Sequence, residues 1–183
     1  MKVLKTVGTV VLSQFLLLST GAWAETNVRV SPLGLLIGSA DVEVDFKISP
    51  SVTLGPTFQF LSLDSEGFDV SAYSVGIRSN IFLNGEVFKS GWYVGPVAKY
   101  INVKVEDTDN SSSNLEGSAS GLMVAVILGY QWMWESFNIN LGVGPGHSFI
   151  DEIRVTDNAG YDETYEGSGG FVLPIEFMLG WKF

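Results

Sequence analysis

The chain contains no cysteine, only one histidine and few basic residues. The absence of cysteine excludes a disulfide scaffold, a thiolate metal site, a cysteine nucleophile and a lipid anchor attached to cysteine. Its 10 Lys and Arg residues stand against 20 Asp and Glu residues, which gives a net charge of −10. We expect no binding to nucleic acid, because contacts with phosphates need clustered cations.

The composition indicates an ordered domain with little surface charge. Charged residues make up 16% of the 183 residues, well below the roughly 25% of an ordinary soluble domain. Hydrophobic residues reach 46%, aromatic residues 13%, and there are 21 glycines. This composition does not suit a disordered chain, and the length suits a single domain.

Residues 1–24 have the pattern of a signal peptide. Lys2 and Lys5 precede an apolar run, and small residues end the segment at Ala22-Trp23-Ala24. A membrane-anchoring helix is the alternative, but the apolar run is shorter than the roughly 20 residues that a spanning helix needs. Cleavage after Ala24 would leave residues 25–183 as one barrel domain, with a charge of 8 − 20 = −12 once two lysines are removed.

The rest of the chain alternates with a period of two. In residues 171–183 every odd position holds a large hydrophobe, whereas the even positions include Glu176 and Lys182. Successive side chains of a strand point to opposite faces, so one face of this segment is wholly apolar. Strands of about ten residues cross a bilayer when they are tilted.

Eight segments carry this alternation or fit it by position. They are residues 29–37, 42–48, 52–63, 73–81, 92–105, 122–132, 137–149 and 171–183. Short turns at 49–51, 84–90 and 135–136 alternate with longer, polar and acidic connections at 64–68, 106–117 and 154–170. We therefore predict an all-β fold, an eight-stranded antiparallel up-and-down transmembrane β-barrel with periplasmic turns and external loops.

The mixed face of each strand should line the inside of this barrel. A charge facing lipid costs about 2–4 kcal/mol near the bilayer midplane, so charged residues should face inward. Six fall on the mixed face: Glu43, Asp45, Lys47, Arg78, Lys99 and Glu176. The interior of an eight-stranded barrel is just wide enough for side chains, so we expect these charges to pair across it and leave no open pore. By phase, Arg29 falls on the outer face.

Aromatic residues gather at the predicted periplasmic end. They are Trp92, Trp132, Trp134 and Trp181, with Phe82, Phe137 and Phe183 beside them. Amphipathic rings sit well at the level of the lipid head groups, so this group predicts one aromatic girdle.

These features resemble small bacterial outer-membrane β-barrels, such as the transmembrane domain of outer-membrane protein A. The terminal Gly180-Trp181-Lys182-Phe183 resembles the signal that the barrel assembly machinery reads. Three motifs resemble a domain-of-unknown-function family of such barrels: residues 32–38, 91–96 and 128–132. The resemblance implies a location in the outer membrane, contact with its lipid and lipopolysaccharide, and no assigned catalytic residue.

The sequence predicts no catalytic, cofactor-binding or metal site. His147 beside Ser148 invites comparison with lipid A deacylases, but adjacent residues of a strand point to opposite faces, and a serine hydrolase needs the two side chains in contact. We expect a non-enzymatic protein with a structural or surface-interaction role. Three alternatives stay open: a hydrolase using His147, a narrow channel for small solutes, and a soluble barrel with an apolar interior.

Overall fold

In the computed structural model the described residues are 25–65, 67–107, 115–157 and 161–183, and the predicted signal peptide at 1–24 lies outside them. The strands are β1 (Thr26–Val30), β2 (Ser39–Lys47), β3 (Val52–Ser65), β4 (Phe68–Phe82), β5 (Gly91–Asp107), β6 (Leu115–Trp134), β7 (Phe137–Val143), β8 (Gly146–Asp157), β9 (Asp162–Glu166), β10 (Gly170–Val172) and β11 (Ile175–Lys182). One short helix, α2 (Pro32–Leu36), follows β1. No helix among these residues is both long and apolar enough to cross a bilayer.

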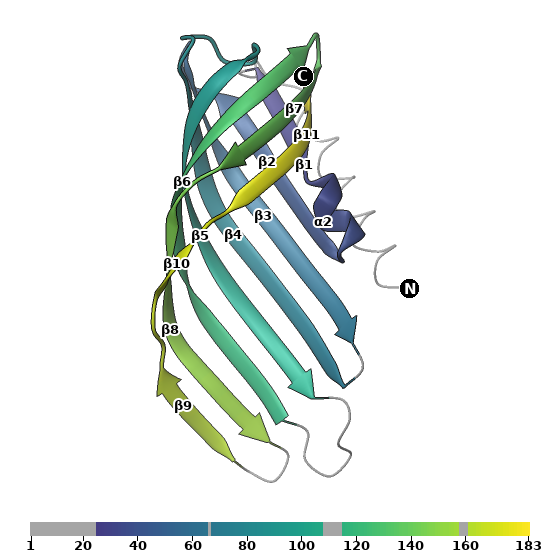
Figure 1. Ribbon diagram of the computed structural model, residues 1–183, viewed down its shortest axis with the longest axis vertical. Helices are drawn as coiled ribbons and strands as arrows, with labels where there is room; N and C mark the ends of the chain where they lie inside the picture. The colour runs from purple at the N-terminus through teal and green to yellow at the C-terminus, as the bar shows by residue number, and fades with distance from the viewer. Residues whose placement is uncertain (1–24, 66, 108–114, 158–160) are drawn as a thin grey trace.

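The strands form a closed antiparallel barrel. Each strand from β1 to β6 pairs with the next, β6 pairs with β7, β7 with β11, and β11 with β1. This circuit contains eight strands, so the all-β, eight-stranded antiparallel barrel is confirmed. In Figure 1 the closed part lies at the top, where β7 and β11 cross in front of the other strands.

The last two strands of the barrel are each divided at a proline. The first is divided between β7 and β8 at Gly144-Pro145, and the second between β10 and β11 at Leu173-Pro174. Proline cannot donate a ladder hydrogen bond. Its carbonyl still accepts one: Val126 N–H donates to Pro145 O at 3.0 Å, and Gly144 N–H to Pro174 O at 3.2 Å. Beyond these breaks β8 continues on β6, and β9 and β10 pair with β8.

The predicted first strand, 29–37, is wrong in its second half. β1 ends at Val30 and the chain turns into α2. Ser31 caps this helix by accepting the N–H of Gly34 at 3.2 Å, and Pro32 occupies its first turn. The capping residue and the proline that follows it favour a helix start, and the proline would leave a strand without a donor.

The strands run into the connections predicted at 64–68, 106–117 and 154–170, because residues 64–65, 68, 106–107, 115–117, 154–157, 162–166 and 170 are strand, while residues 66, 108–114 and 158–160 lie outside the described residues. β3, β4, β5 and β6 run for 14, 15, 17 and 20 residues, and β8 and β9 form a hairpin. We call this end of the barrel the long-strand end and the opposite end, with connections at 48–51, 83–90 and 135–136, the short-turn end. Polar residues at the long-strand end indicated loops, but they alternate with apolar ones, as strands require.

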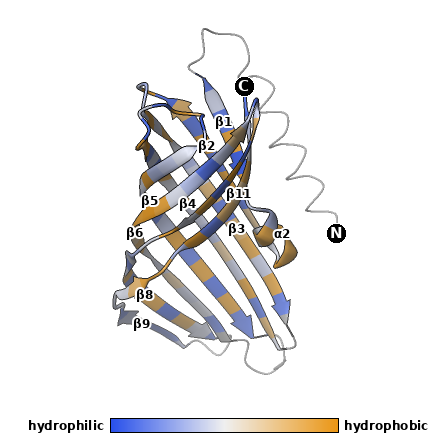
Figure 2. Ribbon diagram, turned by 45° about the horizontal axis from the view of Figure 1, so that its top comes forward, coloured by the Kyte–Doolittle hydropathy of each residue, from blue (hydrophilic) through white to orange (hydrophobic). Residues whose placement is uncertain are grey.

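The inner and outer faces of the barrel differ in character. Figure 2 shows apolar and polar residues alternating along the strands. Large hydrophobes lie exposed on the outer face, among them Ile77, Val126 and Leu128, which are 47–53% exposed. Inside, two small apolar clusters are buried: Phe82, Val87, Phe88 and Tyr93, and then Val97, Ala125 and Ile127. Most other buried inner side chains are polar or charged.

Candidate functional site

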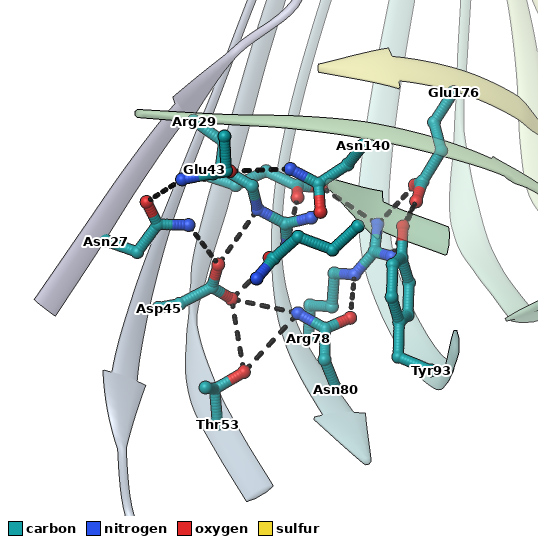
Figure 3. Close-up of polar contacts among 12 residues, drawn as sticks. Asn27, Arg29, Glu43, Asp45, Thr53, Arg78, Asn80, Tyr93, Asn140 and Glu176 are labelled. Atoms are coloured by element: carbon teal, nitrogen blue, oxygen red, sulfur yellow. Dashed lines mark hydrogen bonds and ion pairs between the residues drawn. The ribbon is translucent and has the colours of Figure 1, made fainter. Parts of the chain in front are cut away.

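A buried ionic cluster fills the inside of the barrel, and Arg29 on β1 forms its first half (Figure 3). The guanidinium of Arg29 lies 2.8 Å from a carboxylate oxygen of Glu43 and 2.8 Å from one of Asp45. Both carboxylates project from β2, and Arg29 pairs with Glu43 in the strand register. Arg29 is 1% exposed. The expectation that Arg29 faces outward is therefore wrong: Val28 and Val30 face out, and Asn27 and Arg29 face in.

Arg78 on β4 forms the second half of the cluster. Its guanidinium lies 3.3 Å from Glu43 and makes a two-pronged contact with Glu176 on β11, in which Nη2 donates to Oε1 at 2.8 Å. Arg78 Nε donates to Asn80 Oδ1 at 2.8 Å, and the guanidinium lies 5.7 Å from the centre of the Tyr93 ring. Planar guanidinium groups suit such two-pronged pairing with a carboxylate.

Glu43 joins the two halves, because it contacts both arginines. We call Arg29, Glu43, Asp45, Arg78 and Glu176 the ionic cluster. It contains two cations and three carboxylates, so its formal charge is 2 − 3 = −1. Arg78, Glu43 and Asp45 are only 3–4% exposed. Buried charges need partners, and here each has at least one.

Neutral polar groups complete the cluster. Asn80 Nδ2 donates to Asp45 Oδ1 at 3.0 Å, and the Tyr93 hydroxyl donates to Glu176 Oε1 at 2.5 Å. Further hydrogen bonds link the asparagines of β1 and β7 at 2.7 Å each, from Asn138 to Asn27 and from Asn140 to Asn138. Together with Thr53 and Gln131, these buried inner residues come from every strand of the closed circuit.

Glycines on the inner face give these large side chains their room. A Cβ at Gly129 would lie 2.3 Å from the Tyr93 ring, and one at Gly95 would lie 2.9 Å from Arg78 Nη2. Neither residue could carry a side chain without displacing the cluster, so the glycines of this layer are required by its packing.

Two of the predicted inner charges lie outside the ionic cluster. Lys47 pairs with Glu25 at 2.9 Å at the rim of the short-turn end, where the two side chains are 37% and 48% exposed. Lys99 lies against Gly76, because a Cβ added at Gly76 would lie 2.7 Å from Lys99 Cγ. Among the described residues Lys99 makes no salt bridge.

Sequence reasoning missed several members of this site. They are Arg29 itself and the polar residues Asn27, Asn80, Tyr93, Asn138 and Asn140. The signal was present, because Asn27 and Arg29 alternate with valines, and Asn138 and Asn140 alternate with Phe137, Ile139 and Leu141. Amides on a repeating inner face are hydrogen-bond partners for buried charges.

The predicted aromatic girdle lies on the outer face of the short-turn end. Trp92, Trp134 and Trp181 are 48–53% exposed, Trp132 is 38% exposed and Phe183 is 79% exposed. Ring contacts connect neighbouring strands from Trp92 to Tyr130, from Trp134 to Phe137 and from Phe137 to Trp181. Within β6 the Tyr130 ring also contacts Trp132. Phe82, expected beside them, instead faces inward and packs on Tyr93.

His147 and Ser148 lie on opposite faces of β8. The ring of His147 is exposed on the outer face and contacts the Phe149 ring at a centroid distance of 4.6 Å. The hydroxyl of Ser148 faces inward and donates to the carbonyl of Gly170 at 3.3 Å. The two side chains cannot act together as base and nucleophile, since such a pair must be within hydrogen-bond reach.

The β8–β9 hairpin at the long-strand end carries an exposed ion pair. Arg154 Nε donates to Asp162 Oδ1 at 2.8 Å, and this contact holds the pKa of the Asp162 carboxyl below its usual value. The described residues include no group of three or more His, Cys, Asp or Glu side chains that could hold a metal ion.

Comparison with known proteins adds one match. Residues 8–179 match the model of a family described as "Protein of unknown function (DUF3575)". No curated protein and no solved structure matches the chain.

Proposed function

The chain belongs to the DUF3575 family, and from the geometry of its barrel we propose that it is a non-enzymatic integral protein of a bacterial outer membrane. Its role is structural or a contact with other molecules at the cell surface. The short-turn end faces the periplasm, and the long-strand end with its acidic residues faces outward. Residues 1–24 serve as the cleaved signal peptide that exports the chain.

A band of exposed apolar residues on the outer face carries this proposal. On β5 the band runs from Trp92 to Tyr100, and on β6 from Trp132 to Leu122, with the outward residues between them apolar. These spans are 9 and 11 residues long, which matches the 9–11 residues of a tilted membrane strand. A soluble protein would bury such a band, because large contiguous apolar patches are rarely left in water.

Aromatic rings at both edges of the band support the same proposal. The girdle tryptophans mark the short-turn edge, and Phe60, Tyr73 and Tyr100, which are 42–51% exposed, mark the other. Two aromatic girdles flanking an apolar band are typical of outer-membrane barrels. The ionic cluster lies inside the barrel at the height of the apolar band, where lipid cannot reach its charges.

Lipid and lipopolysaccharide are the proposed neighbours of the band and of its outer edge. The barrel assembly machinery is the proposed partner during insertion, through β11 and the Phe183 that follows it. Phe183 lies against β1, since its N–H donates to Thr26 O at 2.8 Å. The hydrolase and channel alternatives gain no support: His147 and Ser148 point apart, and the buried polar side chains occupy the inside.

Fractionation and depth-dependent quenching test the proposal. After expression in a Gram-negative host, the mature chain should stay with outer membranes through a carbonate wash and begin at Glu25. In vesicles, lipids brominated near the head group should quench tryptophan fluorescence more strongly than lipids brominated near the chain end, because the girdle lies at the interface. Recovery in the soluble fraction, or no quenching by either lipid, would refute the membrane location.

A further inference from the structure

The inner face of the barrel changes from polar to apolar along β3, β4 and β5 toward the long-strand end. On β5 the inward residues of the long-strand half beyond Lys99 are Ile101, Val103 and Val105. The pairing of β5 with β4 and with β6 is unbroken over this stretch. The alternation of faces is therefore also unbroken, and these three side chains point to the same side as Tyr93 and Lys99.

The outer face changes in the opposite sense at the same level. The outward residues of β5 are apolar up to Tyr100 and become Asn102 and Lys104 beyond it. A strand that crossed lipid over its whole length would keep its apolar residues outside. This half of β5 instead has the pattern of a barrel surrounded by water, with its polar face outward.

The neighbouring strands repeat the reversal. Beyond the aromatic edge the inward residues are Leu61 and Leu63 on β3, Ala72 and Val70 on β4, Gly121 and Ala119 on β6, and Ile153 on β8, which pairs with Tyr165 on β9. The outward residues at this level are Ser62, Ser71, Ser118 and Ser120. Four strands reversing together make a continuous apolar inner surface, which we call the inner apolar face.

Nothing among the described residues covers the inner apolar face. Leu63 is 41% exposed, Ile153 36% and Tyr165 47%, whereas the two buried apolar clusters lie further toward the short-turn end. β2 begins at Ser39 and β1 ends at Val30, so in this half the wall has no strand between β2 and β10. Figure 1 shows the long-strand half as a curved sheet that no strand crosses in front.

Polar groups without partners lie where the inner apolar face meets the ionic cluster. Lys99 makes no salt bridge among the described residues, as noted above. The hydroxyls of Thr57 and Ser74 are buried, at 0% and 6% exposure, and neither has a hydrogen-bond partner within the described part of the chain. Thr57 and Lys99 are both register partners of Gly76, so these groups are neighbours.

We propose that the inner apolar face binds a single-chain amphiphile with an anionic head group. The head group lies at Lys99 and accepts hydrogen bonds from the Thr57 and Ser74 hydroxyls, while the apolar chain lies along Ile101 and Val103. Val105 lies six residues along the strand from Lys99, which is a distance of about 20 Å along the inner face. A concave face inside a curled sheet suits a flexible chain, and the ammonium and hydroxyls suit an anion.

Asp41 provides an internal check on the charge of the ligand. Its Oδ1 is buried without a hydrogen-bond partner in the described residues, and Lys99 is one of the charges that act on it. The Asp41 carboxylate therefore competes with an anionic head group for Lys99. Replacing it with asparagine should tighten binding of an anion, whereas an uncharged ligand should be indifferent to the change.

Equilibrium dialysis with radiolabelled dodecanoate and with 1-dodecanol tests this inference on the full mature chain in lipid nanodiscs, with empty nanodiscs as blanks. We expect saturable binding of about one dodecanoate per chain. Val103→Asp should weaken binding of both ligands at least about tenfold, because a carboxylate enters the apolar face. The matched variant Asn102→Asp, one residue away on the outer face, should change either affinity by less than about twofold.

Two further variants test the placement of the head group. Lys99→Met should weaken dodecanoate about tenfold and leave dodecanol unchanged, and Asp41→Asn should strengthen dodecanoate alone. No saturable binding, or equal losses in Val103→Asp and Asn102→Asp, would overturn the inference. Equal effects of Lys99→Met on both ligands would overturn the head-group placement. Binding does not require insertion in a cell membrane, so these results are independent of the fractionation experiment.

Discussion

Replacing Arg78 with methionine should destabilise the barrel far more than replacing any rim cation. Arg78 contacts Glu43 at 3.3 Å, holds Glu176 through two contacts and lies over Tyr93. Methionine keeps most of the apolar stem but removes every charge contact. Glu43 would retain Arg29 as a partner, whereas Glu176 would lose the one arginine that it contacts among the described residues. Removing one partner of a buried pair costs about 3–5 kcal/mol.

Lys47→Met is the matched control. Lys47 pairs with Glu25 at 2.9 Å, but both side chains are more than one third exposed, and exposed pairs contribute about 0–1 kcal/mol. Urea unfolding of the protein in lipid vesicles, followed by tryptophan fluorescence, would give both free energies. Adding Glu176→Gln to Arg78→Met should recover part of the loss, because the unpaired carboxylate is then gone. Equal, small losses for Arg78→Met and Lys47→Met would refute the assignment of the ionic cluster as a stabilising unit.

Three further predictions test other parts of the structure. Val126→Arg in the middle of the outer apolar band should lower the free energy of unfolding in vesicles by about 2–4 kcal/mol. Ser118→Arg, beyond the band, should lower it by about 0–1 kcal/mol. Equal losses would contradict the placement of the band in lipid. Gly129→Ala should cost about 1–3 kcal/mol, because its Cβ would lie 2.3 Å from the Tyr93 ring, and an unchanged urea midpoint would contradict this. The Asp162 carboxyl should titrate by NMR below the ordinary range of an Asp side chain, because Arg154 lowers its pKa. Its contribution to the hairpin is then present at neutral pH and is lost as the pH falls through that lowered pKa. Arg154→Gln should return the Asp162 titration to the ordinary range.

The period of two was enough to predict the barrel and the number of its strands. Large hydrophobes at every second position of β6, β7 and β11 define an outer face without knowledge of the partners, because a strand has only two faces. The same phase places Glu43, Asp45, Arg78 and Glu176 inside. Their grouping around two arginines depends on the register between strands far apart in sequence, which alternation alone does not specify.

Two features escaped the pattern for identifiable physical reasons. The predicted first strand ran to residue 37, so counting every second residue back from Leu33, Leu35 and Ile37 put Arg29 on the outer face, although β1 ends at Val30 and the helix α2 follows. At the long-strand end the acidic residues Glu106, Asp107 and Glu116 look like part of a loop, although β5 and β6 include them. Strand length at this end is set by pairing with the neighbouring strand, which a single segment does not reveal.

The ionic cluster contains residues from both ends of the chain, and this has a consequence for assembly of the barrel. Arg29 comes from the first strand and Glu176 from the last, and Arg78 and Glu43 connect them across the seam where the circuit closes. An intermediate that has not yet received its C-terminal strand leaves Arg78 incompletely neutralised and the interior wet. For the membrane location proposed above, we expect release of the finished barrel into the bilayer to be coupled to arrival of the final segment, and truncated chains to be disfavoured before they reach lipid.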